Sequence, residues 1–133
     1  MSCYQLDHFV LTVSDLAATR QFYGEVLQVP IITFEGDRQA LQIGHQKINL
    51  HVAAAPIAPC ARYPTPGSAD FCLITQTPLA AMITRLQTRG IEIEQGPVER
   101  TGAQGPLWSI YLRDPDGNLV EIANQQQPST AID

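Results

Sequence analysis

Positive charge is scarce in this sequence. Its 133 residues include 8 Lys and Arg against 13 Asp and Glu, which gives a formal net charge of −5, and no run of basic residues occurs. Such a chain has little to attract the phosphates of a nucleic acid or the head groups of an anionic membrane. We therefore expect neither as a partner, and we expect a small neutral or polar molecule as the ligand.

Long apolar segments are also missing. No stretch approaches the roughly 18 consecutive apolar residues that a membrane-spanning helix needs. The first residues, MSCYQLDHF, contain neither a basic segment nor the apolar centre of a signal peptide. These absences predict a protein that stays in the cytoplasm.

Cysteine is present at only three positions, Cys3, Cys60 and Cys72, and no pair has C-x-x-C spacing. An odd number without that spacing argues against a disulfide framework and against a structural zinc site, and favours reduced thiols. Cys72 lies within an apolar run, so we expect it to be a small core residue.

The first half of the chain predicts a β-α-β-β-β unit. Residues 6–13 (LDHFVLTV) predict a strand, and Ser14 is a suitable N-cap for the helical pattern that follows. Three short strand-like runs come next: PIITFE, QALQIG and KINLHV. The segment 54–69 contains four prolines, which disfavour both helix and central strand, so it is predicted to be a connector.

The second half repeats this order. Residues 70–75 predict a strand, Thr77 can cap a helix with Pro78 at its first position, and Gly90 is a suitable residue to end that helix. Three further strands are predicted in IEIEQG, LWSIYLR and NLVEIAN. The polar residues 126–133 follow as a tail.

The two halves can be aligned with each other. Residues 14–18 (SDLAA) match 77–81 (TPLAA), and residues 47–51 (KINLH) match 119–123 (LVEIA). A doubled unit predicts an α+β fold in which two tandem βαβββ modules form a cupped mixed sheet with the helices outside. We expect one domain over residues 1–133, made of these predicted segments: module 1 at about 4–53, the connector 54–69, module 2 at about 70–125 and the tail 126–133.

Polar residues occupy equivalent positions in the two modules. In this alignment His8 corresponds to Asp70, and Asn49 corresponds to Glu121. Because side chains alternate across a strand, His8, Asn49 and His51 should face the concave side of the sheet. The sequence therefore predicts a central polar cluster.

Imidazole nitrogen and carboxylate oxygen on rigid strands can bind Zn²⁺, Fe²⁺, Mn²⁺ or Ni²⁺ and leave positions open for water or substrate. We predict that a divalent cation, whose identity the residues do not determine, binds among His8, His51, Asp70 and Glu121. Taken singly, each residue has a simpler explanation, since a strand His is often structural and a strand Glu often faces water.

Two quoted segments carry a family resemblance: LDHFVLTVSDLAATRQFYGEVL, with its early His and aromatic pair, and YLRDPDGNLVEIAN. Together with the duplication they resemble the vicinal oxygen chelate superfamily of glyoxalase I, extradiol dioxygenases and fosfomycin-resistance proteins, over residues 4 to about 125. Within this range QKINLH, PTPGSAD and GPVERTGAQGP resemble small stand-alone glyoxalase-domain proteins, among them glyoxalase domain-containing protein 5 and the bacterial lactoylglutathione-lyase-like virulence proteins. The resemblance implies a divalent metal that chelates two adjacent substrate oxygens.

The glyoxalase pattern has His, Glu or Gln, His and Glu on the first, fourth, fifth and eighth strands, where this sequence has His8, Asn49, Asp70 and Glu121. Two of the four positions match. Asn is a poor ligand for such an ion, so either His51 replaces it or three ligands hold the metal. Asp70 either binds the metal or acts as the general base.

Three classes of function are open. A lyase or isomerase of glyoxalase type would use Glu121 and Asp70 as catalytic carboxylates. An extradiol dioxygenase, of the type that cleaves biphenyl-2,3-diol, would hold Fe²⁺ with His8, His51 and Glu121. A metal-free binding protein of the bleomycin-resistance type would use Glu121 as a hydrogen-bond acceptor. The short chain favours the first class.

The resemblance also bears on partners. It implies a homodimer with two sites. If glutathione were the thiol substrate, basic side chains near the site would be needed, and Arg38, Arg62 and Arg100 are the candidates.

Overall fold

The computed structural model describes residues 2–126, in two compact units. Unit 1 comprises Met1–Ala69 with Asp114–Asn118, and unit 2 comprises Asp70–Arg113 with Leu119–Asp133. Most of the predicted tail at 126–133 lies outside the described residues. Within residues 2–126, no helix is long and apolar enough to cross a membrane.

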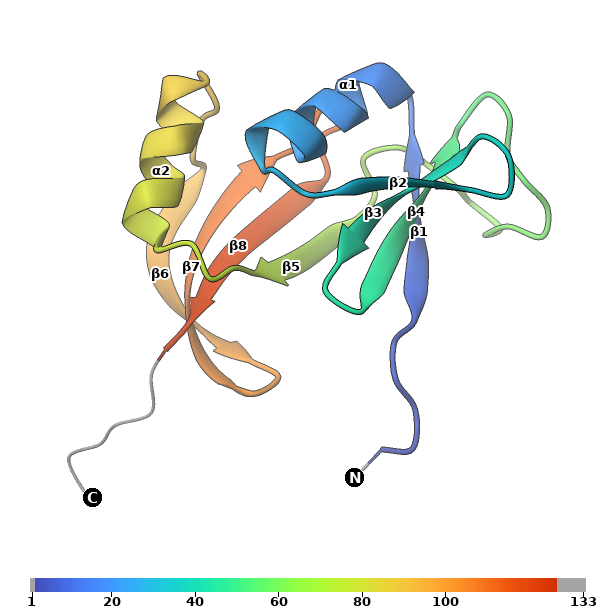
Figure 1. The fold of residues 1–133 in the computed structure, drawn as a ribbon. Helices are drawn as coiled ribbons and strands as arrows, with labels where there is room; N and C mark the ends of the chain where they lie inside the picture. Colours follow the sequence, from blue (N-terminus) through green and yellow to red (C-terminus); the bar gives the residue numbers. More distant parts are fainter. Residues whose placement is uncertain (1, 127–133) are drawn as a thin grey trace. The chain divides into compact units, whose positions relative to one another are not determined.

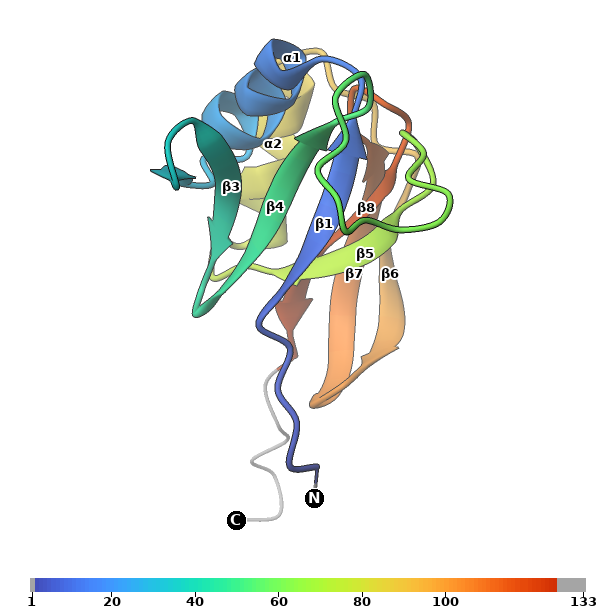
Figure 2. The same cartoon turned by 90° about the vertical axis from the view of Figure 1, so that its right-hand side faces the viewer.

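Unit 1 contains one helical segment and one four-stranded sheet. The sheet order is β1-β4-β3-β2, with β1 parallel to β4 and the other pairs antiparallel. Figure 2 shows β1, β4 and β3 side by side, and Figure 1 labels β2. The elements in chain order are β1 (His8–Val13), α1 (Leu16–Arg20), the π-helix η1 (Gln21–Val26), β2 (Ile31–Phe34), β3 (Arg38–Ile43) and β4 (Gln46–Val52).

Unit 2 repeats this arrangement, with the order β5-β8-β7-β6 and β5 parallel to β8. Its helix α2 packs against β7 (Figure 1). The elements are β5 (Asp70–Ile74), α2 (Leu79–Thr88), β6 (Gln95–Gly102), β7 (Gly105–Arg113) and β8 (Leu119–Gln125). The shared strand order confirms the α+β fold of two tandem βαβββ modules.

The strand registers agree with the predicted alignment of the modules. His8 pairs with Lys47 in unit 1, and Asp70 pairs with Leu119 in unit 2. Asn49 comes two residues after Lys47 on β4, and Glu121 comes two residues after Leu119 on β8. The two halves therefore place His8 and Asp70, and Asn49 and Glu121, at equivalent positions.

Each unit buries a set of apolar side chains from its strands and its helix. Burying one large aliphatic side chain stabilises the fold by about 1.5–3 kcal/mol, so each unit owes its stability mainly to this core. The core of unit 1 includes Leu11, Val13, Leu41, Ile48 and Leu50 with Phe22, Tyr23 and Val26, and that of unit 2 includes Leu79, Met82, Leu86, Ile110, Leu112, Val120 and Ile122.

The start of α1 differs from the prediction. Its N-cap is Asp15, whose Oδ1 accepts from the backbone N–H of Ala17 at 2.9 Å and of Ala18 at 3.3 Å. The cap predicted at Ser14 is wrong, because Asp15 has the extended backbone that an N-cap requires and its carboxylate also complements the helix dipole.

Both ends of α2 are closed by contacts of different kinds. At the start, Asn124 on β8 accepts the backbone N–H of Leu79 at 2.9 Å, whereas the predicted cap Thr77 supplies only its carbonyl to Asn124. At the end, Gly90 has φ +72° and the backbone N–H of Ile91 donates to Leu86 O at 2.9 Å, as in a Schellman motif. Because Ile91 is part of this helix end, it cannot also begin a strand. The strand predicted at 91–96 therefore begins only at Gln95.

The Asp114–Asn118 turn, which follows β7, belongs to unit 1. The backbone N–H of Gly117 donates to Asp114 O at 2.9 Å, which closes the predicted reversal. The buried Asp114 carboxylate accepts from the Tyr23 hydroxyl and from the Asn118 amide, each at 2.8 Å. Burial, followed by the charge of Asp114, raises the pKa of Tyr23, which therefore stays a proton donor. The turn is thus fixed immediately before β8.

Candidate functional site

The predicted polar residues of unit 1 share one face of its sheet. His8 pairs with Lys47 on β4, and Asn49 and His51 follow Lys47 at steps of two residues. Paired residues and residues two apart point to the same side of a sheet. The alternation predicted from the sequence therefore places these three side chains together on one face.

The two histidines are far apart on that face. His8 is level with Lys47, whereas His51 is level with Thr12, so four residues separate them along the strand direction. That spacing is about 13 Å between backbone positions. His8 is exposed, and its Nδ1 lies 2.7 Å from Asp7 Oδ1. Unit 1 therefore does not bring the two imidazoles together.

Asn49 and His51 are buried, with 5% and 7% of their surface exposed. Within residues 2–126, Asn49 Oδ1 and His51 Nε2 have no hydrogen-bond partner. Burial, and secondarily the charge of Arg38, lowers the pKa of His51, so its imidazole is neutral. Buried polar atoms without partners are rare, and those that occur need an explanation such as a bound ion, water or ligand.

Two cations lie over one aromatic ring in unit 1. Lys47 Nζ is 3.5 Å, and Arg38 Cζ is 4.9 Å, from the centre of the Phe34 ring. Arg38 also pairs with Glu35 at 2.9 Å. Of the three candidate arginines, Arg38 is thus already neutralised, and Arg62 is exposed in the connector.

In unit 2, Cys72 pairs with Glu121, and Asp70 pairs with Leu119. Asp70 and Glu121 are therefore diagonal neighbours on one face, with backbone positions about 7–8 Å apart. Glu121 lines the pocket of this face, whereas Asp70 is not among the residues that line it. The sequence alignment predicted this face for Glu121.

Cys72 is exposed, so its prediction as a core residue is wrong. Strand alternation places it on the face of Asp70 and Ile74, opposite Phe71 and Leu73, a signal that was present in the sequence. Burial of the sulfur, then the charge of Glu121 and a hydrogen bond to it, raises the pKa of the Cys72 thiol to about 12. The thiol is therefore protonated and donates to the Glu121 carboxylate.

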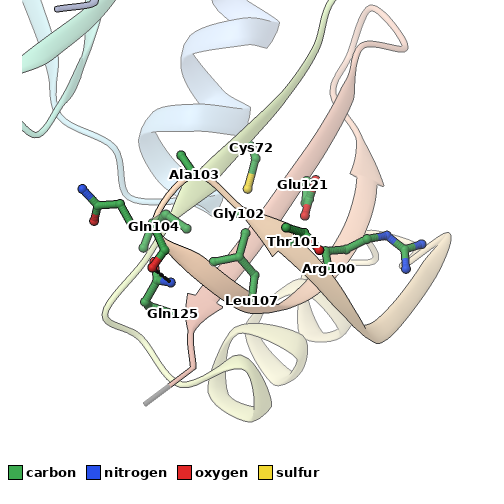
Figure 3. Close-up of a pocket in the computed structure, with 10 residues that line it drawn as sticks. Cys72, Arg100, Thr101, Gly102, Ala103, Gln104, Leu107, Glu121 and Gln125 are labelled. Atoms are coloured by element: carbon green, nitrogen blue, oxygen red, sulfur yellow. Dashed lines mark hydrogen bonds between the residues drawn. The ribbon is translucent and has the colours of Figure 1, made fainter. Parts of the chain in front are cut away.

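A pocket of about 470 Å³ opens on this face of unit 2 (Figure 3). Its volume lies within the range of roughly 300–1,000 Å³ for small-molecule sites. The β6–β7 hairpin forms one wall, and Gln125 Nε2 donates to Gln104 O at 3.3 Å. The pocket is lined by Cys72, Ile74, Arg100, Thr101, Gly102, Ala103, Gln104, Leu107, Glu121 and Gln125.

Several of these lining residues were not predicted as site residues. Leu107, Gln125 and the hairpin residues carry no motif in the sequence, because the pairing of β6, β7 and β8 brings them together. Arg100, one of the three candidate arginines, does line the pocket.

The donor atoms suit a divalent cation. His51 offers a buried, neutral imidazole whose Nε2 has no partner in the described chain, and Glu121 has no basic partner among the ion pairs found there. Nitrogen and carboxylate oxygen are the ligands that Zn²⁺, Fe²⁺ and Mn²⁺ accept. Across residues 2–126, no three His, Cys, Asp or Glu side chains form a group that could hold a metal ion. Metal binding by His8, His51, Asp70 and Glu121 stays a prediction.

Known proteins share both the sequence and the fold. The family model of the Glyoxalase/Bleomycin resistance protein/Dioxygenase superfamily matches residues 5–122. Virulence protein STM3117 of Salmonella typhimurium is 54% identical over 119 residues, which cover 90% of this chain and 83% of that protein. Glyoxalase domain-containing protein RDO1 of Mycosarcoma maydis is 44% identical over 126 residues, covering 95% of this chain and 71% of that protein.

Solved structures agree with this. The crystal structure of virulence protein STM3117 superposes with a TM-score of 0.89 at 52% identity, covering 95% of this chain and 100% of that one. An integron cassette protein from the mobile metagenome of V. cholerae gives a TM-score of 0.89 at 46% identity, covering 95% and 98%. With the family match over residues 5–122 and the duplicated βαβββ fold, these relatives show that the chain belongs to the glyoxalase/bleomycin resistance protein/dioxygenase superfamily.

Proposed function

We propose that this protein is a metal-dependent lyase or isomerase of glyoxalase type that acts on a small substrate with adjacent oxygens. The observation that carries the proposal is the position of Glu121, whose carboxylate lines a pocket of about 470 Å³ without a basic partner among the ion pairs of the described residues. A carboxylate in that setting can hold a cation or accept a proton from a substrate.

The proposed ligands are Glu121 and Asp70 in unit 2 and His51 or His8 in unit 1. Members of this superfamily usually depend on a metal ion. A bound divalent cation supplies Lewis-acid chemistry, polarising two adjacent oxygens of a substrate. The neutral imidazole of His51 is the protonation state that such binding needs.

The residues of unit 2 have separate tasks in this proposal. Glu121 serves as a ligand, and the neutral Cys72 thiol, which donates to it, holds the carboxylate in place. Asp70 is exposed on the same sheet face, and we assign its carboxylate the role of the base that takes up a proton from the carbon beside the substrate carbonyl. Ile74 and Leu107 supply apolar walls of the pocket.

A metal-free binding protein is the second candidate, and the amide at position 49 favours it. Asn49 occupies the position in unit 1 that Glu121 occupies in unit 2, and an amide oxygen is a weak ligand for these ions. The dioxygenase has less support, because His8 and His51 lie four residues apart in register and do not form a pair within unit 1.

The test is Glu121→Gln, which keeps the volume of the side chain and removes its charge. We expect purified wild-type protein, reconstituted with Ni²⁺, Zn²⁺, Mn²⁺ or Fe²⁺ in turn, to bind one of them stoichiometrically. The variant should lose this ion, because a neutral amide does not compensate the cation. Metal content is measured by plasma mass spectrometry after gel filtration.

Glu92→Gln is the matched control, since Glu92 is exposed in the same unit and does not line the Glu121 pocket. It should keep its metal. Thermal unfolding of chelator-treated proteins should give similar midpoints for all three. Full metal retention by Glu121→Gln would remove Glu121 from the ligand set, and a wild-type protein that takes up none of the ions would favour the metal-free binding protein.

A further inference from the structure

Arg100 on β6 is held in a fixed position on the pocket face of unit 2. Its Nε donates to the Tyr111 hydroxyl at 2.8 Å, and its Nη1 donates to the backbone oxygen of Glu99 at 3.0 Å. The guanidinium carbon also lies 5.4 Å from the centre of the Tyr111 ring. Although the residue is exposed, these three contacts restrict the orientation of its guanidinium.

The contacts of Arg100 are all with neutral groups. By contrast, Arg38 pairs with Glu35, and Arg113 pairs with Glu94, both at 2.9 Å. The carboxylate of the adjacent Glu99 belongs to the other face of β6 and accepts from Gln126 at 3.1 Å. Within residues 2–126, no ion pair neutralises Arg100.

The guanidinium is also close to the proposed reaction centre. Tyr111 pairs directly with Glu121 across β7 and β8, and Arg100 donates to the hydroxyl of that same tyrosine. Arg100 and Glu121 both line the pocket, as Figure 3 shows. A fixed positive group and a carboxylate therefore belong to residues that border the same pocket.

We infer that Arg100 binds an anionic group of the substrate, so that the substrate class is small organic anions bearing a carboxylate or a phosphate. The inference rests on the proposed function in one respect, which is that the rest of the substrate reacts at Glu121. Binding of an anion by Arg100 does not depend on it. Guanidinium N–H groups match carboxylate and phosphate oxygens in geometry, and such charge-assisted hydrogen bonds are stronger than neutral ones. Because contacts to Tyr111 and Glu99 already orient the side chain, binding an anion costs little further ordering.

The two ends of the pocket then give the substrate a direction. The anionic group is bound at Arg100, and the reacting oxygens face Glu121. Among the residues that line the pocket, Arg100 is the one basic side chain and Glu121 the one acidic side chain, so an anionic group is attracted to the Arg100 end and repelled from the Glu121 end. Arg100 is thus a residue that selects and orients the substrate, and the proton transfer stays with the carboxylates.

The experiment uses chelator-treated, metal-free full-length protein, so that anion binding is measured independently of the cation. The Arg100 Nε–H resonance is followed by NMR at constant ionic strength during titration with acetate, inorganic phosphate or acetamide. Acetate and acetamide have nearly the same size and differ in charge. We expect a saturable shift with one or both anions and none with acetamide. The anion that binds more tightly, acetate or phosphate, identifies the substrate group as a carboxylate or a phosphate.

Three variants complete the test, with binding followed through the backbone amides of Thr101 and Gly102. Arg100→Gln should weaken anion binding by about tenfold or more, and Arg100→Lys, which keeps the charge without the planar fork, should weaken it less. Arg62→Gln, an exposed arginine outside the pocket, should bind as the wild type does. Equal shifts with acetamide, or unchanged anion binding in a folded Arg100→Gln, would overturn the inference.

The outcome separates this inference from the proposed function. Arg100→Gln should keep its metal, and Glu121→Gln should keep its anion binding. Anion binding by a protein that takes up no cation would support the role of Arg100 and refute the lyase. Stoichiometric metal binding without anion binding would support the metal-dependent function and refute the role of Arg100.

Discussion

Cys72 shows how burial and one cross-strand neighbour, Glu121, together set the chemistry of a side chain. The thiol lies on the pocket face, where an exposed cysteine would ordinarily react. Burial of the sulfur and the neighbouring carboxylate instead raise its pKa to about 12. The thiol therefore acts as a hydrogen-bond donor and not as a nucleophile.

This contact predicts slow alkylation of Cys72. At pH 8, iodoacetamide should modify the exposed Cys3 and Cys60 first, because only thiolates react and Cys72 remains protonated. Glu121→Gln removes the charge, so the rate at Cys72 should rise by about tenfold or more, while Cys3 and Cys60 are unchanged. Peptide mass spectrometry over time measures all three sites. Equal rates at Cys72 and Cys60 in the wild type would contradict the contact.

At the scale of elements, the helix of unit 1 depends on one carboxylate. α1 has only five residues before it continues as η1, so the hydrogen bonds from Asp15 to Ala17 and Ala18 satisfy much of its free N-terminal turn. Ser14 contributes its backbone N–H to Asp116 at 3.2 Å, a bond that does not need the serine side chain.

The two positions therefore predict different costs. Asp15→Ala should lower the free energy of unfolding by about 1 kcal/mol, within the range of roughly 0.5–2 kcal/mol for lost N-caps. Ser14→Ala should change it by less than about 0.5 kcal/mol, as is usual for an exposed position. Urea unfolding followed by circular dichroism gives both values. A larger loss of unfolding free energy in Ser14→Ala than in Asp15→Ala would contradict this and indicate Ser14 as the N-cap.

For the whole molecule, large apolar side chains are exposed near one sheet edge. Tyr4 and Leu6, which precede β1, are 85% and 59% exposed, and Val10 on β1 is 43% exposed. β1 is the end strand of its sheet in unit 1. Exposed apolar residues beside an unpaired strand edge favour association with another chain.

We therefore predict that the protein is a homodimer. Light scattering at micromolar concentration should give twice the chain mass of 14.6 kDa. The double variant Tyr4→Ser with Leu6→Ser should shift the mass toward the monomer, because it removes apolar area from this edge. Tyr63→Ser changes an equally exposed tyrosine in the connector and should have no effect. A monomeric wild type would contradict the prediction.

Local patterns in the sequence were sufficient for the elements and their duplication. Alternation within strands and the internal alignment placed Glu121 and Asp70 at related positions of one face, because strand periodicity depends on neighbouring residues alone. The turn at Asp114–Gly117 was likewise evident from its residue types. The resemblance carried by residues 6–27 and 111–124 agrees with the superfamily match over residues 5–122.

Contacts between distant residues could not be inferred in this way. Asn124 closes the start of α2 at Leu79, 45 residues earlier, and Tyr111 positions Arg100 through its hydroxyl. The separation of His8 from His51 likewise depends on the register of β1 against β4. Strand register and side-chain contacts between distant residues are set by packing of the folded chain. The modules therefore follow from local sequence, whereas the pocket and the position of Arg100 in it are decided by the tertiary structure.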